Sequence, residues 1–166
     1  MKKIISPWFP CLVFFLIMLF SIVYNEFGSV LAQQQEQNQT ASVSVGGVNL
    51  LASLSTTPES QAKGLATKGS LEETEGMLFI FESPQKYSFW MKDMKFPIDI
   101  IWINSAGKIV HIESKLPPCI FLLPCPSYTP KDDSLYVLEV VSNFTDKFNI
   151  NVGDDVDSQV IKHTQR

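Results

Sequence analysis

Arginine is almost missing from this chain, because Arg166, the last residue, is the only one. The 13 lysines and arginines are outnumbered by 17 aspartates and glutamates, so the formal net charge is −4. A protein that binds nucleic acid needs a basic face, and bidentate recognition of phosphate needs arginine. We therefore expect no nucleic-acid partner.

Histidine and cysteine are also scarce, with two and three copies. His111 and His163 are too few to form a histidine triad around a metal ion. The sequence also lacks a serine–histidine signature, a nucleophile elbow and a glycine-rich phosphate loop. We therefore predict no metal and no cofactor, and the sequence favours a non-enzymatic role without excluding an enzyme.

A long apolar run is present at the N-terminus. Lys2 and Lys3 precede a stretch whose smooth core, Cys11 to Val23, has 13 residues, and the small-residue segment Val30-Leu31-Ala32 follows. A signal peptide has an apolar core of about 7–15 residues, whereas a spanning helix needs about 20. Residues 1–32 are therefore predicted to be a cleaved signal peptide or an uncleaved membrane anchor, with a buried core helix as a third alternative. Both main alternatives place the rest of the chain outside the cytoplasm, either secreted or membrane-anchored.

A glutamine-rich segment, residues 33–40, cannot bury apolar surface and is predicted to be a flexible tether. Residues 41–166 are long enough for a single domain with its own core. Two triplets, which begin at Asn38 and Asn143, match the N-glycosylation sequence.

Short apolar runs separated by turn residues dominate the domain, with little room for helices. Gly46-Gly47 predicts a tight hairpin, and residues 104–107 predict a second one. Thr57-Pro58-Glu59 predicts the start of a short helix that ends at Gly64 or Gly69, and Ser142 or Asn143 is expected to cap one more helical turn. Strands are expected over residues 41–45, 48–54, 76–81, 86–91, 98–103, 108–113, 135–141 and 155–161. The order predicts an α+β fold with a curved, mainly antiparallel sheet or a small, partly closed barrel.

Two of these strands carry an acid although both of their faces are apolar. Side chains alternate across a strand, so Asp99 shares a face with Ile101, and Glu139 shares a face with Val137. Both strands are therefore expected to be central in the sheet. A buried carboxylate must be hydrogen-bonded, paired or protonated.

The acids have two interpretations. In the structural one, Asp99 and Glu139 accept backbone N–H bonds and fix loops. In the functional one, they form a ligand pocket with Trp90, Lys92 and Asp93, where an acid of raised pKa could bind a hydroxylated ligand or act as a general acid or base. Trp90 is either a core residue or an exposed aromatic platform for a sugar or peptide.

Cys119 and Cys125 are predicted to form a disulfide, because two cysteines six positions apart in an exported domain can close a small ring. A metal site is the weaker alternative. The ring contains the apolar residues 120–123, which could fold back over the core or contact a partner or membrane.

A set of short motifs runs in order along the domain. They are Thr57-Pro58-Glu59, Gly64-Leu65, residues 75–79, Phe89-Trp90-Met91-Lys92-Asp93, residues 97–100, residues 107–110, Tyr128 near Pro130, Tyr136-Val137-Leu138-Glu139 and Gly153-Asp154. In these motifs the chain resembles the DUF192 (UPF0127) family over residues 45–157. The chain departs from members that have asparagine at the position of Asp93 and methionine at that of Ala66. The resemblance implies a compact β-rich fold and an exported or membrane-associated protein, and it supplies no catalytic residues.

Three functional hypotheses follow. The first is an extracytoplasmic binding module for a small polar ligand or an envelope component, with the pocket described above. The second is a hydrolase of envelope saccharides that uses Asp99 or Glu139 as acid or base. The third is an accessory protein without a ligand that docks through the 119–125 loop.

Overall fold

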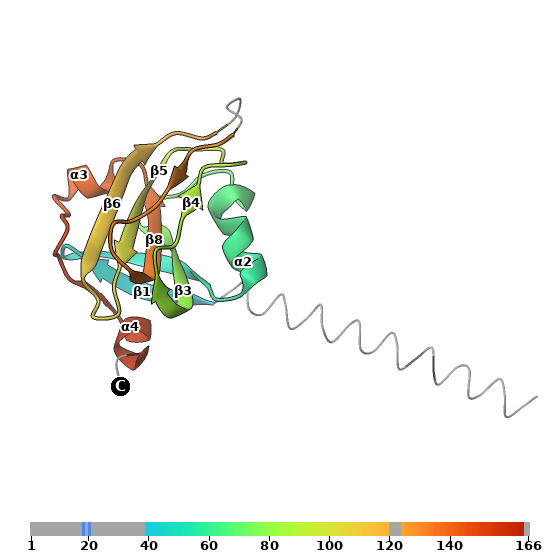
Figure 1. The fold of residues 1–166 in the computed structure, drawn as a ribbon, viewed down its shortest axis with the longest axis horizontal. Coiled ribbons are helices and arrows are strands. Elements are labelled where there is room, and N and C mark those ends of the chain that lie inside the picture. Colours follow the sequence, from blue (N-terminus) through green and yellow to red (C-terminus); the bar gives the residue numbers. More distant parts are fainter. Residues whose placement is uncertain (1–17, 19, 21–38, 120–123, 165–166) are drawn as a thin grey trace, which may run out of the picture. The chain divides into compact units, whose positions relative to one another are not determined.

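The computed structural model describes residues 18, 20, 39–119 and 124–164 (Figure 1). The chain divides into two units, residues 1–38 and 39–166. The predicted export segment, apart from Met18 and Phe20, and Asn38 of the first sequon lie outside the described residues. Within the described part of the chain, no helix is long and apolar enough to cross a membrane. The predicted tether ends early, because Thr40 already belongs to the first strand.

A curled seven-stranded sheet forms most of the domain (Figure 1). Its strand order is β6 (Ile109–Leu116), β5 (Ile98–Ile103), β8 (Ser134–Val141), β3 (Glu75–Gln85), β2 (Val48–Ser55), β1 (Thr40–Val45) and β9 (Val156–Ser158). All neighbours are antiparallel except β2 and β3. The two edges approach each other, because Val156 N donates to Gly107 O at 2.8 Å. The sheet is therefore a half-barrel, which confirms the predicted β-rich fold class.

Both predicted hairpins are present. Gly46 and Gly47 join β1 to β2 with φ values of 57° and 81°, the left-handed conformations of a tight hairpin turn. Asn104 opens the turn between β5 and β6, where its side-chain oxygen accepts hydrogen bonds from Ala106 N and Lys108 N, each at 3.0 Å. Local turn chemistry sets both connections.

Two predicted strands are shorter in the structure, and two others, β3 and β6, extend beyond their predicted C-terminal ends at residues 81 and 113. Within residues 86–91 only β4 (Phe89–Trp90) is a strand, and it pairs with β7 (Ser127–Tyr128) in a separate two-stranded sheet. The neighbours of β3 in the large sheet are β2, which pairs with its first half, and β8. The last strand stops at Ser158, where α4 (Gln159–Thr164) begins. The hydroxyl of Ser158 accepts a hydrogen bond from Ile161 N at 3.1 Å and thereby caps this helix.

The first helix, α2 (Pro58–Lys63), begins where the sequence predicts. Thr57 and Ser60 form a capping box in which Ser60 N donates to Thr57 Oγ1, and Thr57 N donates to Ser60 Oγ. Gly64 ends the helix with a φ of 49°, and a short 3₁₀ helix, η1 (Gly64–Thr67), continues the chain.

The two faces of the sheet carry two separate apolar cores. One core contains Leu78, Ile101 and Val140, and the other contains Phe79, Ile100 and Trp102. Strands β5 and β8 contribute to both cores and are buried along nearly their whole length, so the prediction that both are central is confirmed.

The core also holds a hydroxyl group without a hydrogen-bond partner, that of Tyr136 on β8. We expect Tyr136→Phe to leave the free energy of unfolding unchanged or to raise it by about 1–2 kcal/mol, because it removes a desolvated polar group and keeps the ring. Urea denaturation measures this change. Tyr87→Phe is the matched control, because the Tyr87 hydroxyl donates to Ser83 O at 2.7 Å. A clear loss of stability in Tyr136→Phe would contradict the expectation.

Candidate ligand-binding groove

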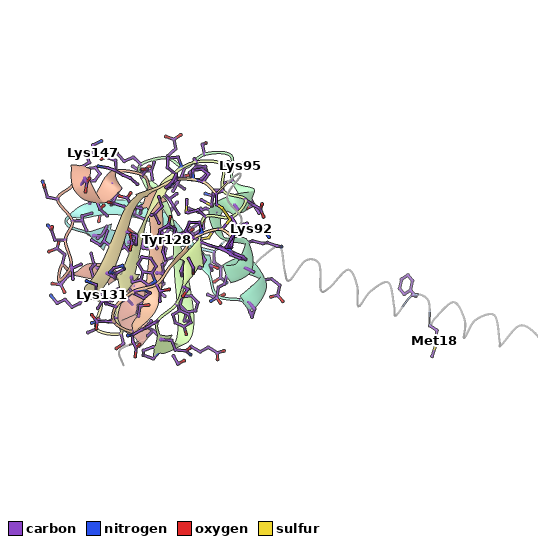
Figure 2. The ribbon with its side chains drawn as sticks, turned by 45° about the horizontal axis from the view of Figure 1, so that its top comes forward. Met18, Lys92, Lys95, Tyr128, Lys131 and Lys147 are labelled. Carbon is purple, nitrogen blue, oxygen red and sulfur yellow. A yellow bond between two sulfur atoms is a disulfide. The ribbon has the colours of Figure 1, made fainter. Side chains whose placement is uncertain are left out.

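A groove lies between the segment α2–η1 and strand β4. Its inner part has a volume of about 40 Å³ and its outer part about 380 Å³. Figure 2 shows Lys92, which lines both parts, beside α2. The inner part is lined by Gln61, Ala62, Lys63, Gly64, Leu65, Ala66, Phe79, Phe89, Trp90, Lys92, Met94 and Glu139. The outer part shares five of these residues and adds Thr67 and Asp93.

Glu139 supplies a carboxyl group at the inner end of the groove. The residue is 5% exposed, and its Oε2 atom has no hydrogen-bond partner. Burial raises the pKa of the Glu139 carboxyl to about 8, while a hydrogen bond from the Leu65 backbone amide partly opposes this rise. At neutral pH the group is therefore largely a protonated acid, which can both donate and accept a hydrogen bond.

The end of α2 positions the backbone against this acid. Gly64 has a positive φ, which a residue with a side chain rarely adopts, and it turns the chain directly beside β8. A Cβ atom on Gly64 would lie 3.7 Å from Glu139 Oε2 and 3.5 Å from the Phe79 ring. Gly64 thus brings the Leu65 amide to the carboxyl and leaves the side of Oε2 open.

Trp90 forms the rim of the groove. Its side chain is 57% exposed, whereas its neighbour Met91 is 1% exposed. The Lys92 ammonium lies 5.4 Å from the centre of the Trp90 ring, a cation–π contact. Trp90 is therefore not a core residue, and its indole is available as an aromatic platform.

The predicted disulfide is present and lies next to the rim of the groove. Cys119 and Cys125 are bonded, with their Cα atoms 5.9 Å apart. Cys119 N donates to Met91 O at 2.9 Å, which ties the cysteine ring to the segment that carries Trp90 and Lys92. The apolar residues 120–123 of the ring lie outside the described residues.

Asp93 lies in the outer part of the groove with a φ of 59°. Aspartate and asparagine tolerate this left-handed conformation better than most residues. The backbone at this turn therefore explains why either residue type can stand there.

Asp99 is not part of the groove. It is fully buried on the opposite face of the sheet, because it pairs across β5 and β8 with Val140, whereas Glu139 pairs with Ile100. Its carboxylate accepts four hydrogen bonds, from Lys115 N (2.8 Å), Asn143 N (3.0 Å), Thr145 N (2.9 Å) and Thr145 Oγ1 (2.7 Å). Asp99 thus joins the end of β6 to the turn after β8.

These bonds correct the predicted cap at residues 142–143. Helix α3 (Phe144–Lys147) has no side-chain cap from Asn143, which has a left-handed φ of 70°. The Asp99 carboxylate caps the helix instead, because it accepts a hydrogen bond from Thr145 N. Asn143 of the second sequon is exposed, but the Thr145 hydroxyl of the same triplet is buried against Asp99.

The sequence of the chain matches one protein family over most of its length. The DUF192 model, described as "Uncharacterized ACR, COG1430", matches residues 41–158. The chain belongs to the DUF192 family. No curated protein matches this chain.

Two solved structures resemble the DUF192 domain. One is a Sinorhizobium meliloti 1021 protein described as a candidate transcription regulator, with a TM-score of 0.64 and 22% identity, covering 72% of this chain and 92% of that one. The other is a protein of unknown function from Novosphingobium aromaticivorans DSM 12444, with a TM-score of 0.63 and 26% identity, covering 71% of this chain and 83% of that one. The first likeness shows the fold alone.

The DUF192 domain thus brings four of the five predicted site residues to one groove and leaves Asp99 apart. Sequence reasoning missed Lys63 and the backbone of Leu65, although the Gly64-Leu65 pair directly after a predicted helix was a usable signal. Segments far apart in the sequence, from α2, β3, β4 and β8, meet at Glu139. Within the described residues, no group of three or more His, Cys, Asp or Glu side chains could hold a metal ion.

Proposed function

We propose that this DUF192 domain is an extracytoplasmic binding module for a small hydroxylated ligand, such as a saccharide or an envelope fragment. One observation carries the proposal: Glu139 Oε2 is buried, has no partner and lines a groove that opens beside the exposed Trp90. A buried polar atom without a partner costs free energy of folding. A ligand group that bonds to Oε2 would offset that cost.

The dimensions of the groove support a ligand with a body and one inserted group. Ligand sites in proteins have volumes of roughly 300–1,000 Å³, and the outer part, at about 380 Å³, falls at the lower end of that range. The inner part, at about 40 Å³, admits a single small group such as a hydroxyl. A sugar ring would lie by the Trp90 indole and direct one hydroxyl to Glu139.

Two features support a location outside the cytoplasm. The Cys119–Cys125 disulfide suits an oxidising compartment, since cytosolic thiols are kept reduced. The apolar segment near the N-terminus has the composition of an export signal or anchor.

The hydrolase hypothesis in its two-carboxylate form has no geometric support. Glycoside hydrolysis needs two carboxyl groups on either side of one bond. Asp99 and Glu139 point to opposite faces of the sheet, and each oxygen of the Asp99 carboxylate already accepts two hydrogen bonds. These two acids therefore cannot act on one substrate together.

The test is ligand-induced stabilisation of the full chain by a panel of neutral, acidic and amino monosaccharides. We expect at least one sugar to raise the melting temperature of the parent. Glu139→Leu, which removes the hydrogen-bonding group, should weaken binding about tenfold or more. Glu139→Gln should retain most of the binding, because the amide also donates and accepts hydrogen bonds. If Glu139 were instead a catalytic acid, both variants would lose the activity.

Trp90→Ala and Glu82→Gln complete the design. Trp90→Ala should lose binding and keep its stability, because the side chain is largely exposed. Glu82 is exposed and does not line the groove, so Glu82→Gln should behave like the parent. If no sugar stabilises the parent, or if Glu139→Leu and Trp90→Ala bind as the parent does, the proposed function is wrong.

A further inference from the structure

Two lysines flank the entrance to Glu139, and neither forms an ion pair with an acid in the part of the chain that the structure describes. Lys63, from the end of α2, and Lys92, after β4, both line the inner and the outer part of the groove. The ion pairs of the described residues involve other bases, namely Lys68, Lys108, His111, Lys115 and Lys147. Lys92 contacts the Trp90 ring instead.

The two acids that line the groove offset the positive charge of these lysines only in part. Asp93 lines only the outer part of the groove and forms no ion pair with a described base. Glu139 lines only the inner part, where its surroundings favour the protonated, neutral form. The outer lining therefore carries two positive charges and one negative charge, in a domain whose net charge is negative.

We infer that the ligand is an acidic sugar, whose carboxylate is bound by Lys63 and Lys92 while a hydroxyl reaches Glu139. This inference rests on the proposed function and specifies its ligand class. A ring beside Trp90 would bring its substituents within reach of the Lys92 ammonium, which already lies over the indole. Both lysines line the inner and the outer part of the groove, so their positive charges would repel a cationic sugar and attract an anionic one.

The experiment compares three probes that share a pyranose ring and differ in charge: D-glucuronate, D-glucose and D-glucosamine. Isothermal titration of the full chain at neutral pH and low salt should show D-glucuronate binding about tenfold or more tightly than D-glucose, with D-glucosamine weakest. Added salt should reduce this preference, because exposed charges are screened. The Lys63→Gln/Lys92→Gln variant should bind D-glucuronate no better than D-glucose.

Lys131→Gln is the matched control. Lys131 is an exposed lysine that does not line the groove, and it lies away from Lys92 in Figure 2. This variant should keep the parent's preference for D-glucuronate. Equal loss in Lys131→Gln and in the double variant would mean that overall charge, not the groove, sets the preference, and would overturn the inference.

The remaining outcomes separate this inference from the proposed function. If D-glucose or D-glucosamine binds as well as D-glucuronate, and Glu139→Leu weakens that binding, the acidic sugar is wrong and the binding module stands. If inorganic phosphate binds as tightly as D-glucuronate, the groove recognises negative charge without a sugar ring, and the assignment of an acidic sugar is wrong. If none of the three sugars binds, both proposals fail.

Discussion

Asp99→Asn is expected to lower the free energy of unfolding by about 3–5 kcal/mol, one of the largest effects for a single atom exchange in this domain. The carboxylate accepts three backbone N–H bonds and one hydroxyl bond at a fully buried position. An asparagine amide keeps one acceptor oxygen and places an NH₂ group against donors that then have no acceptor. Hydrogen bonds to a charged group contribute about 1.5–3 kcal/mol each, and buried donors left unpaired add to the loss.

Denaturant unfolding of the full chain measures this change, with Asp133→Asn as the matched control. Asp133 is exposed in the loop before β8, so its substitution should change stability by less than about 0.5 kcal/mol. Lys115 and Asn143 both have positive φ values, and the Asp99 bonds hold these two backbone positions in place. If Asp99→Asn is as stable as Asp133→Asn, Asp99 is not the anchor that the geometry shows.

Glu139→Gln is expected to be more stable than the parent at high pH and equally stable at low pH. Below a pH of about 4.5 the Glu139 carboxyl is protonated in both the folded and the unfolded chain. As the pH rises from about 4.5 to about 8, the unfolded chain releases this proton while the folded chain retains it, so the stability of the parent falls. Above a pH of about 8 both states are ionised and the difference is constant.

The full effect is on the order of 5 kcal/mol if the folded pKa stands at about 8, since each tenfold change in proton affinity corresponds to about 1.4 kcal/mol. Glutamine keeps the shape and the acceptor for the Leu65 amide but has no proton to lose. Chemical denaturation of parent and variant across this pH range gives the difference directly. Glu82→Gln, at an exposed position, should show no such trend, and a pH-independent difference for Glu139→Gln would refute the raised pKa.

These two variants separate the two interpretations of buried acids that the sequence left open. Asp99 has the properties of a structural anchor, because each of its carboxylate oxygens accepts two hydrogen bonds from the protein. Glu139 has the properties of a group held at a cost in stability, because burial outweighs its one backbone hydrogen bond. Functional sites commonly carry such a cost.

The local features of the fold could be read from the sequence. Gly46-Gly47 dictates a hairpin, because two consecutive left-handed residues match the twist of paired strands. Thr57 and Pro58 dictate the start of α2, because one caps the helix and the other suits its first turn. Cys119 and Cys125 could be paired because few residues separate them. In each case the decisive interaction lies within a few residues of the chain.

The groove depended on contacts between distant segments. The alternation of side chains within one strand determined that Asp99 lies on the same face as Ile101 and that Glu139 lies on the same face as Val137. It could not relate the two strands to each other, because the register between β5 and β8 is set by non-local pairing, and a shift of one residue exchanges the faces. The parallel pairing of β2 with β3 and the exposure of Trp90 likewise follow from the packing of distant segments.

The sequence by itself therefore determined a β-rich DUF192 domain with two central, acid-bearing strands, a short helix after Thr57 and a disulfide, because alternation, turn chemistry and capping act locally. Only the tertiary structure decided which carboxyl group has all its hydrogen bonds and which keeps an oxygen without a hydrogen-bond partner. That decision depends on donors that arrive from other segments: the amides of Lys115, Asn143 and Thr145 reach Asp99, whereas Leu65 alone reaches Glu139 among the described backbone donors. The same packing placed Lys63 and Lys92 in the groove that Glu139 lines.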